Sequence, residues 1–558
     1  MAEEKKGFPI GVENFYDMVT RNSYYVDKTL LIKDVIDSQS TVTLCTRPRR
    51  FGKSLAISML QYYFENLKKE DASIFDGLKI ANTGEKYLAE QNKYPVIKLT
   101  MKSVEGRTFE SAFDGVKFLM YREYRRHDYL LDADALSNDE KETFRRLRGE
   151  KATRKEYEKS LQFLSECLHK HWHEKVVILI DEYDVPLEKA YFKGYYDEMI
   201  NFIRLFYGNA LKTNDSLHKA ILTGCLRVSK ESIFTGLNNL DIVSIVSKDY
   251  AEYFGFTQSE VEEALNYYGK LHKLEEAQNW YNGYLFGETI VYNPWSMIKY
   301  LRDINSSDNH SPESYWGNTS SNEIIKELIY EADDVTKKEI ESLMRNETLT
   351  KPIYQDIVYA EIKQNMNHLW SFLYFTGYLK KVSEKTIKRK LHFELKIPND
   401  EIGYIYDRFI SAWIHDHVQQ LNYSKLYEAI TKEDAETVEE EISNALFKTI
   451  SYMDHAEHFY HGIMIGILGP IPGYYLKSNR EAGHGRLDLM LTPMRSRDPG
   501  IVIEMKVAKA LKEVEEKKKE ALEQIEEEGY AKAFEEEGYR VIKYGIVFLG
   551  KECFVVQG

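Results

Sequence analysis

Residues 45–54, CTRPRRFGKS, have the composition of a loop that binds nucleotide phosphates. In the pattern G-x-x-x-x-G-K-[ST], backbone N–H groups surround the phosphates, while the lysine and the hydroxyl reach the β/γ-phosphates and Mg²⁺. Gly52, Lys53 and Ser54 fill the last three places, and Ser54 is the expected Mg²⁺ ligand. Arg47 occupies the first place, where glycine is usual. Because arginine lacks the freedom of glycine at positive φ, we expect the turn to differ.

The residues around this loop extend the candidate nucleotide site. Arg49 and Arg50 bring positive charge, and contacts from these cations can offset some of the lost loop geometry. A β-branched run precedes the loop at 41–46 and a helical pattern follows it at 54–65, which is the context that a phosphate loop requires. The candidate nucleotide contacts of the loop are Arg49, Arg50, Phe51, Gly52, Lys53, Ser54 and Leu55.

A second motif strengthens the first. The segment VVILIDEYD at 176–184 is an apolar strand that ends in two acids, Asp181 and Glu182. Asp181 is expected to hold Mg²⁺ through water, and Glu182 to orient and deprotonate the attacking water. A later strand ends near Thr223, a candidate sensor of the γ-phosphate, and Arg227 follows as a candidate charge stabiliser. An ion pair between Arg227 and a surface carboxylate is the alternative.

Near the other end of the chain, GRLDLML supplies Asp488 and IVIEMK supplies Glu504 and Lys506. Glu504 and Lys506 are two residues apart in a strand pattern, so their side chains face the same side. Two carboxylates form a hard-oxygen site for Mg²⁺, and a neighbouring lysine can position water or stabilise negative charge. These residue types predict a phosphodiester hydrolase, for which the alternative is an ion pair on a sheet face.

An upstream helix pattern at 456–469 adds one more acid to this second site. It carries Glu457, a candidate third metal ligand beside Asp488 and Glu504. Mg²⁺ is the expected ion, with Mn²⁺ as an alternative. Gln524, on a later helix, can line the same groove or serve only in packing.

Alternating strands and helices must position the first site. Strand patterns at 41–46, 94–101, 175–186 and 217–226 are separated by helical segments, which predicts a parallel sheet with helices on both faces. After about residue 305 the pattern is mainly helical, and the last hundred residues alternate strands and helices again, as in a separate α/β unit.

Composition limits the class of protein. The 558 residues are 43% hydrophobic and carry a net charge of −14, so a nucleic-acid contact needs a local basic surface. The basic stretches at 121–129 and 144–157 are candidates, with exposed helix faces as the alternative. The four cysteines are far apart and argue for a reducing compartment. Without an apolar signal core or a run of about 20 apolar residues, we expect a cytoplasmic protein and no membrane contact.

Together these segments resemble bacterial AAA-ATPase-like proteins that carry a C-terminal PD-(D/E)XK nuclease domain. Matching segments run through nearly the whole chain and include YYVDKTLLI, RPRRFGKS, LIDEYDVPLEKA, FYHGIMIGIL, GHGRLDLML and IVIEMK. The resemblance implies an α/β protein with a P-loop (ASCE/AAA-like) parallel-sheet ATPase domain at 1–300, a mainly helical middle region at 301–450 and a restriction-endonuclease-like α/β domain at 451–558. The loop RPRRFGKS then looks like the family's own form of the phosphate loop.

The resemblance also implies a function: an ATPase that uses ATP and Mg²⁺, coupled to a Mg²⁺-dependent nuclease acting on DNA or RNA. The implied catalytic residues are Glu182, Asp488, Glu504 and Lys506. One alternative is a nucleotide-dependent switch or scaffold whose nuclease-like domain binds nucleic acid or a partner without cleavage. A phosphotransferase is a weaker alternative, since the sequence has no acceptor-binding signature. ATPases of this kind often act as rings or dimers, so a homo-oligomer stays open.

Overall fold

The computed structural model describes residues 5–227, 239–317, 325, 327–329, 331–355, 366–419, 422–449, 457–482, 485–495, 497–527, 534 and 538–558. The chain divides into two compact units. The first comprises Met1–Asn322 and Thr348–Gly403, and the second comprises Glu323–Glu347 and Tyr404–Gly558. Each unit has its own five-stranded sheet and its own buried core.

A parallel sheet forms the centre of the first unit, with the strand order β2-β3-β4-β1-β5. Its strands are β1 (Val42–Thr46), β2 (Val96–Thr100), β3 (Val176–Asp181), β4 (Leu217–Gly224) and β5 (Leu240–Val243). β3 is buried at every position, in keeping with its run of apolar residues. Because parallel strands share one direction, the residues that follow β1, β3 and β4 meet at the same edge of the sheet.

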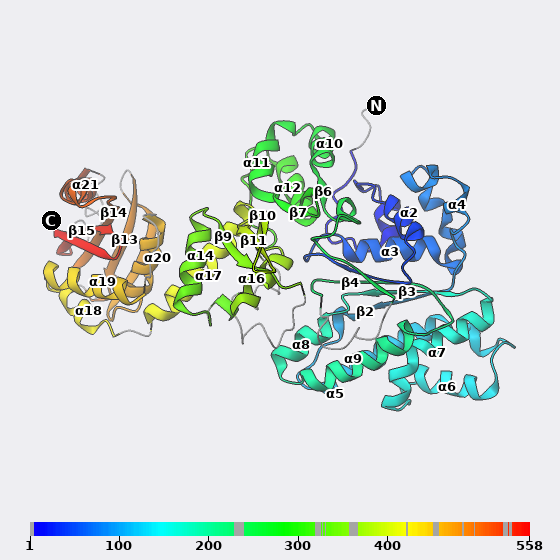
Figure 1. The fold of residues 1–558 in the computed structure, drawn as a ribbon. Helices are drawn as coiled ribbons and strands as arrows, with labels where there is room; N and C mark the ends of the chain where they lie inside the picture. The colour runs from blue at the N-terminus through cyan, green and yellow to red at the C-terminus, as the bar shows by residue number, and fades with distance from the viewer. Residues whose placement is uncertain are drawn as a thin grey trace. The chain divides into compact units, whose positions relative to one another are not determined.

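Helices cover both faces of this sheet (Figure 1). α3 (Lys53–Phe64) lies on one face, while α5 (Phe109–Arg126), α7 (Arg154–Trp172) and α9 (Tyr196–Leu211) lie on the other. The parallel sheet with helices on both faces that the sequence predicts is therefore confirmed. Further helices of this unit are α1 (Phe15–Thr20), α2 (Leu30–Asp37), α4 (Glu85–Leu88), α6 (Asn138–Arg148) and α8 (Val185–Lys193).

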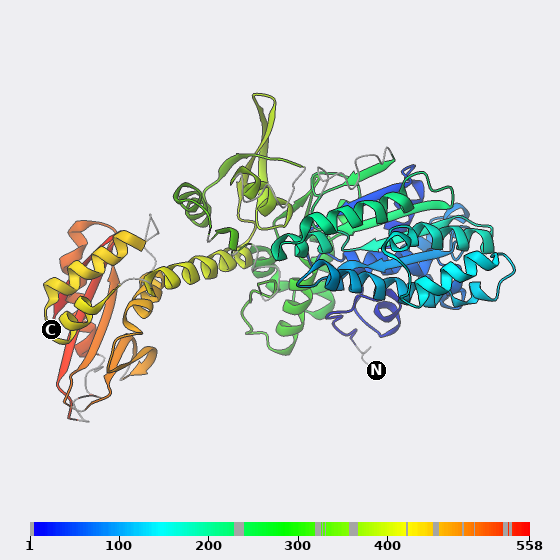
Figure 2. The ribbon, with the colours of Figure 1, turned by 90° about the horizontal axis from the view of Figure 1, so that it is seen from below.

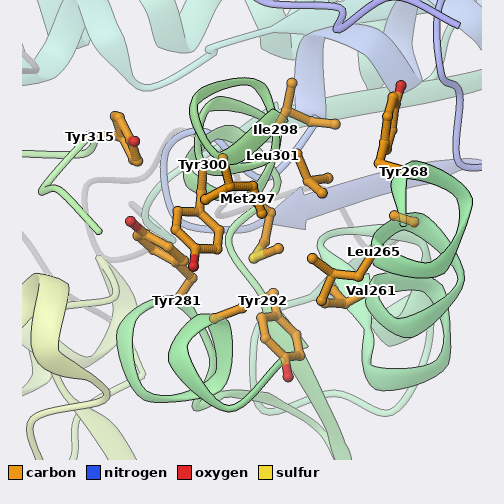
Figure 3. Close-up of a cluster of buried hydrophobic side chains, with 13 residues drawn as sticks. Val261, Leu265, Tyr268, Tyr281, Tyr292, Met297, Ile298, Tyr300, Leu301 and Tyr315 are labelled. Atoms are coloured by element: carbon orange, nitrogen blue, oxygen red, sulfur yellow. The ribbon is translucent and has the colours of Figure 1, made fainter. Parts of the chain in front are cut away.

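A smaller helical group follows the sheet in the chain. Its helices are α10 (Gln258–Tyr268), α11 (Leu274–Tyr281) and α12 (Pro294–Ser306). They enclose a core rich in tyrosine, which Figure 3 shows with Tyr281 and Tyr300 beside Met297. Phe8 and Ile10, from the start of the chain, pack against this core. A short antiparallel sheet accompanies these helices and consists of β6 (Phe256–Thr257), β8 (Thr289–Tyr292) and β7 (Tyr284–Phe286).

The middle of the chain contains an antiparallel sheet that the sequence analysis did not predict. β10 (Lys380–Ile387), β11 (Lys390–Lys396) and β9 (Leu349–Pro352) pair in the order β10-β11-β9. Most residues of β10 are charged or polar and exposed, which hides the two-residue alternation of a strand. The rest of this region is helical and includes α14 (Asp334–Met344), α16 (Met366–Phe375), α17 (Asp400–Gln419), α18 (Ser424–Thr431) and α19 (Ala435–Thr449).

The second unit contains a mixed sheet with the order β12-β13-β14-β15-β16. Its strands are β12 (Tyr474–Ala482), β13 (Gly485–Pro493), β14 (Gly500–Val507), β15 (Val541–Leu549) and β16 (Glu552–Gln557). Only β14 and β15 are parallel neighbours among these described strands. Two helices, α20 (Glu457–Leu468) and α21 (Val514–Glu527), contact β14. The predicted C-terminal α/β domain is confirmed, although its last strand, β16, was not predicted.

Candidate functional site

The phosphate loop joins the end of β1 to the start of α3 and turns without a glycine at its first place. Two loop residues have positive φ, Arg50 at 70° and Gly52 at 85°. Arg47 is not among the residues with positive φ. The turn therefore differs from a glycine-first loop, as expected, because the left-handed conformation falls three residues later, on Arg50.

Arg47 has a structural role in the loop. Its side chain is completely buried, and burial lowers the pKa of its guanidinium group. The guanidinium donates hydrogen bonds of 2.9, 3.1 and 3.1 Å to the carbonyl oxygens of Thr46, Val243 and Asp249. It also lies 5.2 Å from the ring centres of both Phe254 and Phe286. These contacts fix the start of the loop to the end of the edge strand β5 and to the segment that follows it.

The two arginines that the sequence assigns to the phosphates both have protein partners. Arg49 forms an ion pair of 2.7 Å with Glu188 of α8. Arg50 is exposed, and its guanidinium carbon lies 4.3 Å from the ring centre of Trp295 at the start of α12. Arg49 would have to exchange Glu188 for a phosphate in order to contact a nucleotide.

Lys53 is buried inside the loop. Its Nζ donates hydrogen bonds of 3.1 Å to the carbonyl oxygens of both Arg47 and Pro48, and it lies 3.8 Å from Glu182 Oε1. Burial acts to lower the pKa of Lys53, but Cys225, Glu182 and other acidic neighbours raise it more, so the pKa stays above its ordinary value. A charged lysine is therefore held at the centre of the turn that should surround the phosphates.

Ser54 of α3 and Thr223 of β4 meet at the carboxylate of Asp181, the last residue of β3. The Ser54 hydroxyl donates a 2.6 Å hydrogen bond to Asp181 Oδ2, and the Thr223 hydroxyl donates one of 2.6 Å to Oδ1. Asp181 is buried, and burial, followed by the charge of Glu182, raises its pKa. Hydroxyl and carboxylate oxygens are the ligands that Mg²⁺ prefers in proteins, so this group fits the ion.

Glu182 directly follows β3 and has φ at 54°, a conformation that costs energy for a residue other than glycine. Its Oε2 is buried and has no hydrogen-bond partner among the described residues. An unsatisfied buried carboxylate oxygen is costly, and a bound water would satisfy it.

Arg227, the candidate charge stabiliser, lies three residues beyond the end of β4 and is partly buried.

A cavity of about 460 Å³ opens over the phosphate loop. This volume is in the range of small-molecule sites. The cavity walls are formed by loop residues 49–56, by the segments 9–13 and 24–26, and by Trp295 and Ile298 of α12. Leu55 belongs to this wall, and Phe51 packs on the ring of Tyr284 with centres 4.9 Å apart.

The sequence analysis missed a buried acid, Asp184, just behind this site. Its Oδ2 accepts hydrogen bonds of 2.9 Å from the backbone N–H groups of Cys225 and Leu226. Burial, and then the charge of Glu182, raise the pKa of Asp184 to about 7. The acid therefore fastens the turn after β3 to the turn after β4. The sequence offered one signal for Asp184: a third acid within four residues at the end of an apolar strand. It offered no signal for Trp295 and Glu188, because their partners, Arg50 and Arg49, are far away in the sequence.

In the second unit, Asp488 of β13 reaches across to β14. Its Oδ2 accepts a 2.9 Å hydrogen bond from the backbone N–H of Met505, the residue between Glu504 and Lys506. Burial raises the pKa of Asp488. The structure thus brings Asp488 to the part of β14 that carries the other two candidate residues.

Glu504 and Lys506 are in direct contact. Lys506 Nζ donates hydrogen bonds of 2.9 Å to Glu504 Oε1 and of 2.7 Å to Gln524 Oε1 of α21. Glu504 is only 2% exposed, and its Oε2 has no hydrogen-bond partner in the described part of the chain. Burial, and then the charge of Asp488, raise the pKa of Glu504 to about 7.

α20 adjoins this group through His461, whose Nε2 lies 3.0 Å from the backbone oxygen of Asp488. Glu457 is the first residue of the same helix, but its side chain lies outside the described part of the structure. Among the described residues, no three His, Cys, Asp or Glu side chains form a group that could hold a metal ion. Asp488 and Glu504 fit a divalent ion as two hard oxygen donors, one of them with a buried unsatisfied oxygen.

The comparisons with known proteins agree with both units. Residues 9–234 match the family described as "Predicted AAA-ATPase", and residues 455–558 match the PD-(D/E)XK nuclease superfamily. The chain combines an AAA-ATPase-like domain with a domain of the PD-(D/E)XK nuclease superfamily.

A curated protein of Azotobacter chroococcum mcd 1, described as "Uncharacterized protein in vnfD 5'region", is similar over the whole chain. It is 23% identical over 557 residues, which cover 98% of this chain and 96% of that protein. In the ranges that the structure describes, no helix combines the length and the apolar character that a membrane span requires.

Proposed function

We propose that the first unit binds and hydrolyses ATP with Mg²⁺, and that the second unit is a metal-dependent phosphodiesterase that acts on nucleic acid. The cavity over the phosphate loop supports the first part, because Lys53 and the N–H groups at the start of α3 are next to it. Ser54 and Asp181 would hold the Mg²⁺, and Thr223 would contact the γ-phosphate. Arg49, Arg50 and Arg227 would add charge, and Phe51 and Leu55 would shape the wall.

Hydrolysis needs a base beside the phosphates, and Glu182 is the proposed one. Its unsatisfied Oε2 is available to accept a hydrogen bond from a water molecule. Its contact with Lys53, at 3.8 Å, keeps the carboxylate at the loop. The strained φ of Glu182 is consistent with a residue held in position for chemistry.

One observation carries the nuclease proposal: Glu504 is buried beside Asp488 with an unsatisfied oxygen, and Lys506 is bonded to it. The charged form of a buried carboxyl group is costly when one of its oxygens has no partner, and a bound divalent cation would stabilise that form. A bound Mg²⁺ or Mn²⁺ would supply Lewis-acid chemistry at the scissile phosphate. Asp488 and Glu504 would hold the ion, with Glu457 as the proposed third ligand, and Lys506 would stabilise negative charge that develops on the phosphate.

A buried contact supports coupling between the two activities. Glu401, at the start of α17, accepts hydrogen bonds of 2.9 Å from the Ser296 hydroxyl and of 2.8 Å from the backbone N–H of Trp316. Ser296 follows Trp295, which lines the cavity. α17 itself runs from the first unit into the second. A change in α12 on nucleotide binding would thus act on the helix that leads to the nuclease domain.

The test is a cleavage assay on single- and double-stranded DNA and RNA, with Mg²⁺ or Mn²⁺ and with ATP, ADP or no nucleotide. We expect cleavage by the wild type and none by Glu504→Ala or Lys506→Ala. Lys519→Ala, which removes a 78% exposed lysine of α21, is the matched control and should cleave like wild type.

The same samples separate the alternative, a nucleotide-dependent switch. ATP at 100-fold excess over Kd should stabilise the first unit by about 2.7 kcal/mol in the wild type, and not in Lys53→Ala. Stabilisation without cleavage of any substrate would favour the switch. Cleavage that survives in Glu504→Ala would remove this site from the mechanism.

A further inference from the structure

The antiparallel hairpin formed by β10 and β11 is longer than the strand that supports it. β11 pairs with β9 only at 392–395, so residues 386–391 continue as a two-stranded ribbon beyond β9. All residues at 382–390 are exposed. In Figure 2 the hairpin is the long yellow-green loop that extends from the middle of the chain. This segment contributes little to any buried core of the described structure.

The hairpin is strongly basic, although the chain as a whole has a net charge of −14. Residues 380–396 contain seven lysine and arginine residues and two glutamates. The six residues at the tip, 385–390, include four cations and no acid; the cations are Lys385, Lys388, Arg389 and Lys390. None of these four forms an ion pair with the residues that the structure describes.

The two glutamates of the hairpin are engaged nearer its base. Glu384 forms an ion pair of 2.7 Å with Lys381. Glu394 accepts hydrogen bonds from the hydroxyls of Thr348 and Ser383, and these bonds, together with the charge of Lys385, lower its pKa. Neither glutamate lies within the tip, so the charge of the tip is available to a partner.

Strand alternation gathers the cations of the tip. Lys385 is paired with His392, and Ile387 is paired with Lys390, so Lys385 and Lys390 project from the same face of the ribbon. The remaining two cations, Lys388 and Arg389, form the two-residue turn between the strands. Four exposed cations are therefore gathered within the six residues of the tip.

The turn itself carries a second signal. Lys388 has φ at 47° and Arg389 has φ at 65°. A two-residue turn with positive φ at both positions strongly favours Asn-Gly, because most other side chains are strained there. Two long cations in such a turn cost conformational energy that no contact in the described structure offsets. This cost points to a function outside the fold.

The basic stretches that the sequence singled out are weaker candidates. Four of their arginines are paired within the first unit: Arg126 with Glu65 and Glu123, Arg146 with Glu156, Arg148 with Asp128, and Arg154 with Glu158. The described structure has no ion pair for the other three, Arg122, Arg125 and Arg145, and each stretch also contains acids. Paired charges attract phosphates less than unpaired ones do. The hairpin tip is thus a stronger candidate than these stretches for a surface that binds an anionic ligand.

We propose that the tip of the β10–β11 hairpin, residues 385–390, is a nucleic-acid contact that binds the sugar-phosphate backbone. Unpaired lysine and arginine side chains suit phosphate oxygens, and a two-stranded ribbon fits the major groove of a DNA duplex. The inference rests on the proposed function only in taking nucleic acid as the partner. Cleavage chemistry is not needed for it.

The experiment measures binding of the full chain to a fluorescent DNA duplex in EDTA, where metal-dependent cleavage cannot occur, between about 50 and 200 mM salt. The main variant is Lys388→Asn with Arg389→Gly, which installs the favoured turn and removes two cations. The variant should be at least as heat-stable as wild type, so that any loss of binding is not a loss of folding. The matched control is Lys86→Gln with Lys248→Gln, which removes two lysines that are 66% and 72% exposed and paired with acids.

We expect the slope of log affinity against log salt to fall by about 1.8 in the turn variant, or about 0.9 for each lost phosphate contact. At the low-salt end its affinity should be roughly tenfold weaker than that of wild type, while the control should match wild type. Single-stranded DNA and duplex RNA, run in parallel, identify the preferred form of the backbone.

Two outcomes would overturn the inference. One is an unchanged affinity and salt slope in the turn variant, and the other is a wild type that binds none of the nucleic acids. If the wild type cleaves nucleic acid while the turn variant binds normally, the proposed function stands and the hairpin contact fails. If the hairpin-dependent binding is found but cleavage is absent, the hairpin contact stands and the nuclease proposal fails.

Discussion

The guanidinium of Arg47 donates a 3.1 Å hydrogen bond to the carbonyl oxygen of Val243, so a residue of the phosphate loop is anchored to the end of strand β5. The loop is therefore shaped by a long-range contact at the place where most phosphate loops use a glycine. The loop residues that have positive φ are Arg50 and Gly52. The backbone after Gly52 continues directly into α3, and Lys53 and Ser54 lie in the first turn of this helix.

We expect Arg47→Gly, which restores the usual motif, to destabilise the first unit. Three carbonyl oxygens lose their donor, and a buried space is left behind, so the free energy of unfolding should fall by about 3 kcal/mol. Arg50→Gly is the matched control. It relieves a strained φ and loses one cation–π contact, so its effect should stay within about 1 kcal/mol. Urea unfolding measures both, and a stabilised Arg47→Gly would contradict the structural role of Arg47.

Thr223→Val should weaken the nucleotide site more than Thr223→Ser does. Valine keeps the shape of threonine but leaves Asp181 Oδ1 without its 2.6 Å donor, which should cost about 2 kcal/mol of stability. The rate of ATP hydrolysis should fall about tenfold or more if this hydroxyl also contacts the γ-phosphate. Serine keeps the donor and should retain most of the rate. Equal rates in the two variants would remove the Thr223 hydroxyl from the reaction.

Glu504→Gln should stabilise the metal-free second unit and abolish its response to metal. Burial raises the pKa of Glu504 to about 7, so the charged form is the costly one and a neutral amide avoids that cost. The unfolded state releases this proton near pH 4.5, so the gain should grow as pH rises from about 4.5 to about 7, reach about 3 kcal/mol there and be absent below about 4.5. Thermal unfolding in EDTA measures the gain. Added Mn²⁺ should raise the melting temperature of wild type only; a variant that responds to Mn²⁺ as wild type does would place the ion elsewhere.

Glu401 predicts a pH dependence in the first unit. Burial raises its pKa from 4.5 to about 7, so the folded state holds a proton that the unfolded state releases between these values. Its stabilising contribution is complete below about 4.5 and is lost as pH rises through about 7, for a total of about 3 kcal/mol.

Glu401→Gln keeps the shape of the side chain and removes the titration, so wild type should lose stability relative to this variant across that window. Tryptophan fluorescence during urea unfolding follows the difference. Asp184, whose pKa is also raised to about 7, is present in both proteins, so its contribution to the pH dependence cancels in the difference between them. A constant difference between wild type and variant at every pH would show that Glu401 does not titrate in this range.

Local patterns predicted the parallel sheet and the C-terminal α/β domain because strands and helices of these parts have clear apolar periods. The two-residue spacing of Glu504 and Lys506 predicted a shared face, and the structure has them in contact at 2.9 Å. Their chemical roles, and those of Lys53, Ser54 and Asp181, stay predictions. Motif residues are predictable since their neighbours in the chain set their positions.

Long-range partners could not be predicted in this way. The role of Arg47 depends on Val243 and Asp249, about 200 residues later in the chain. The bond from Ser296 to Glu401 likewise joins distant segments. β10 was missed because its exposed, lysine-rich strand has no apolar face. In β11 the alternation of Leu391, Phe393 and Leu395 was an available signal that the sequence analysis did not use.

The anchoring of Arg47 constrains how this loop can evolve. A return to glycine at position 47 would leave the carbonyl groups near 243 and 249 without a donor, so a single substitution passes through a destabilised intermediate. Because the acceptors are backbone groups, the side chains that should covary with Arg47 among relatives are those of Phe254 and Phe286, whose rings lie 5.2 Å from its guanidinium. Genome searches that demand glycine at the first motif place will overlook proteins built this way.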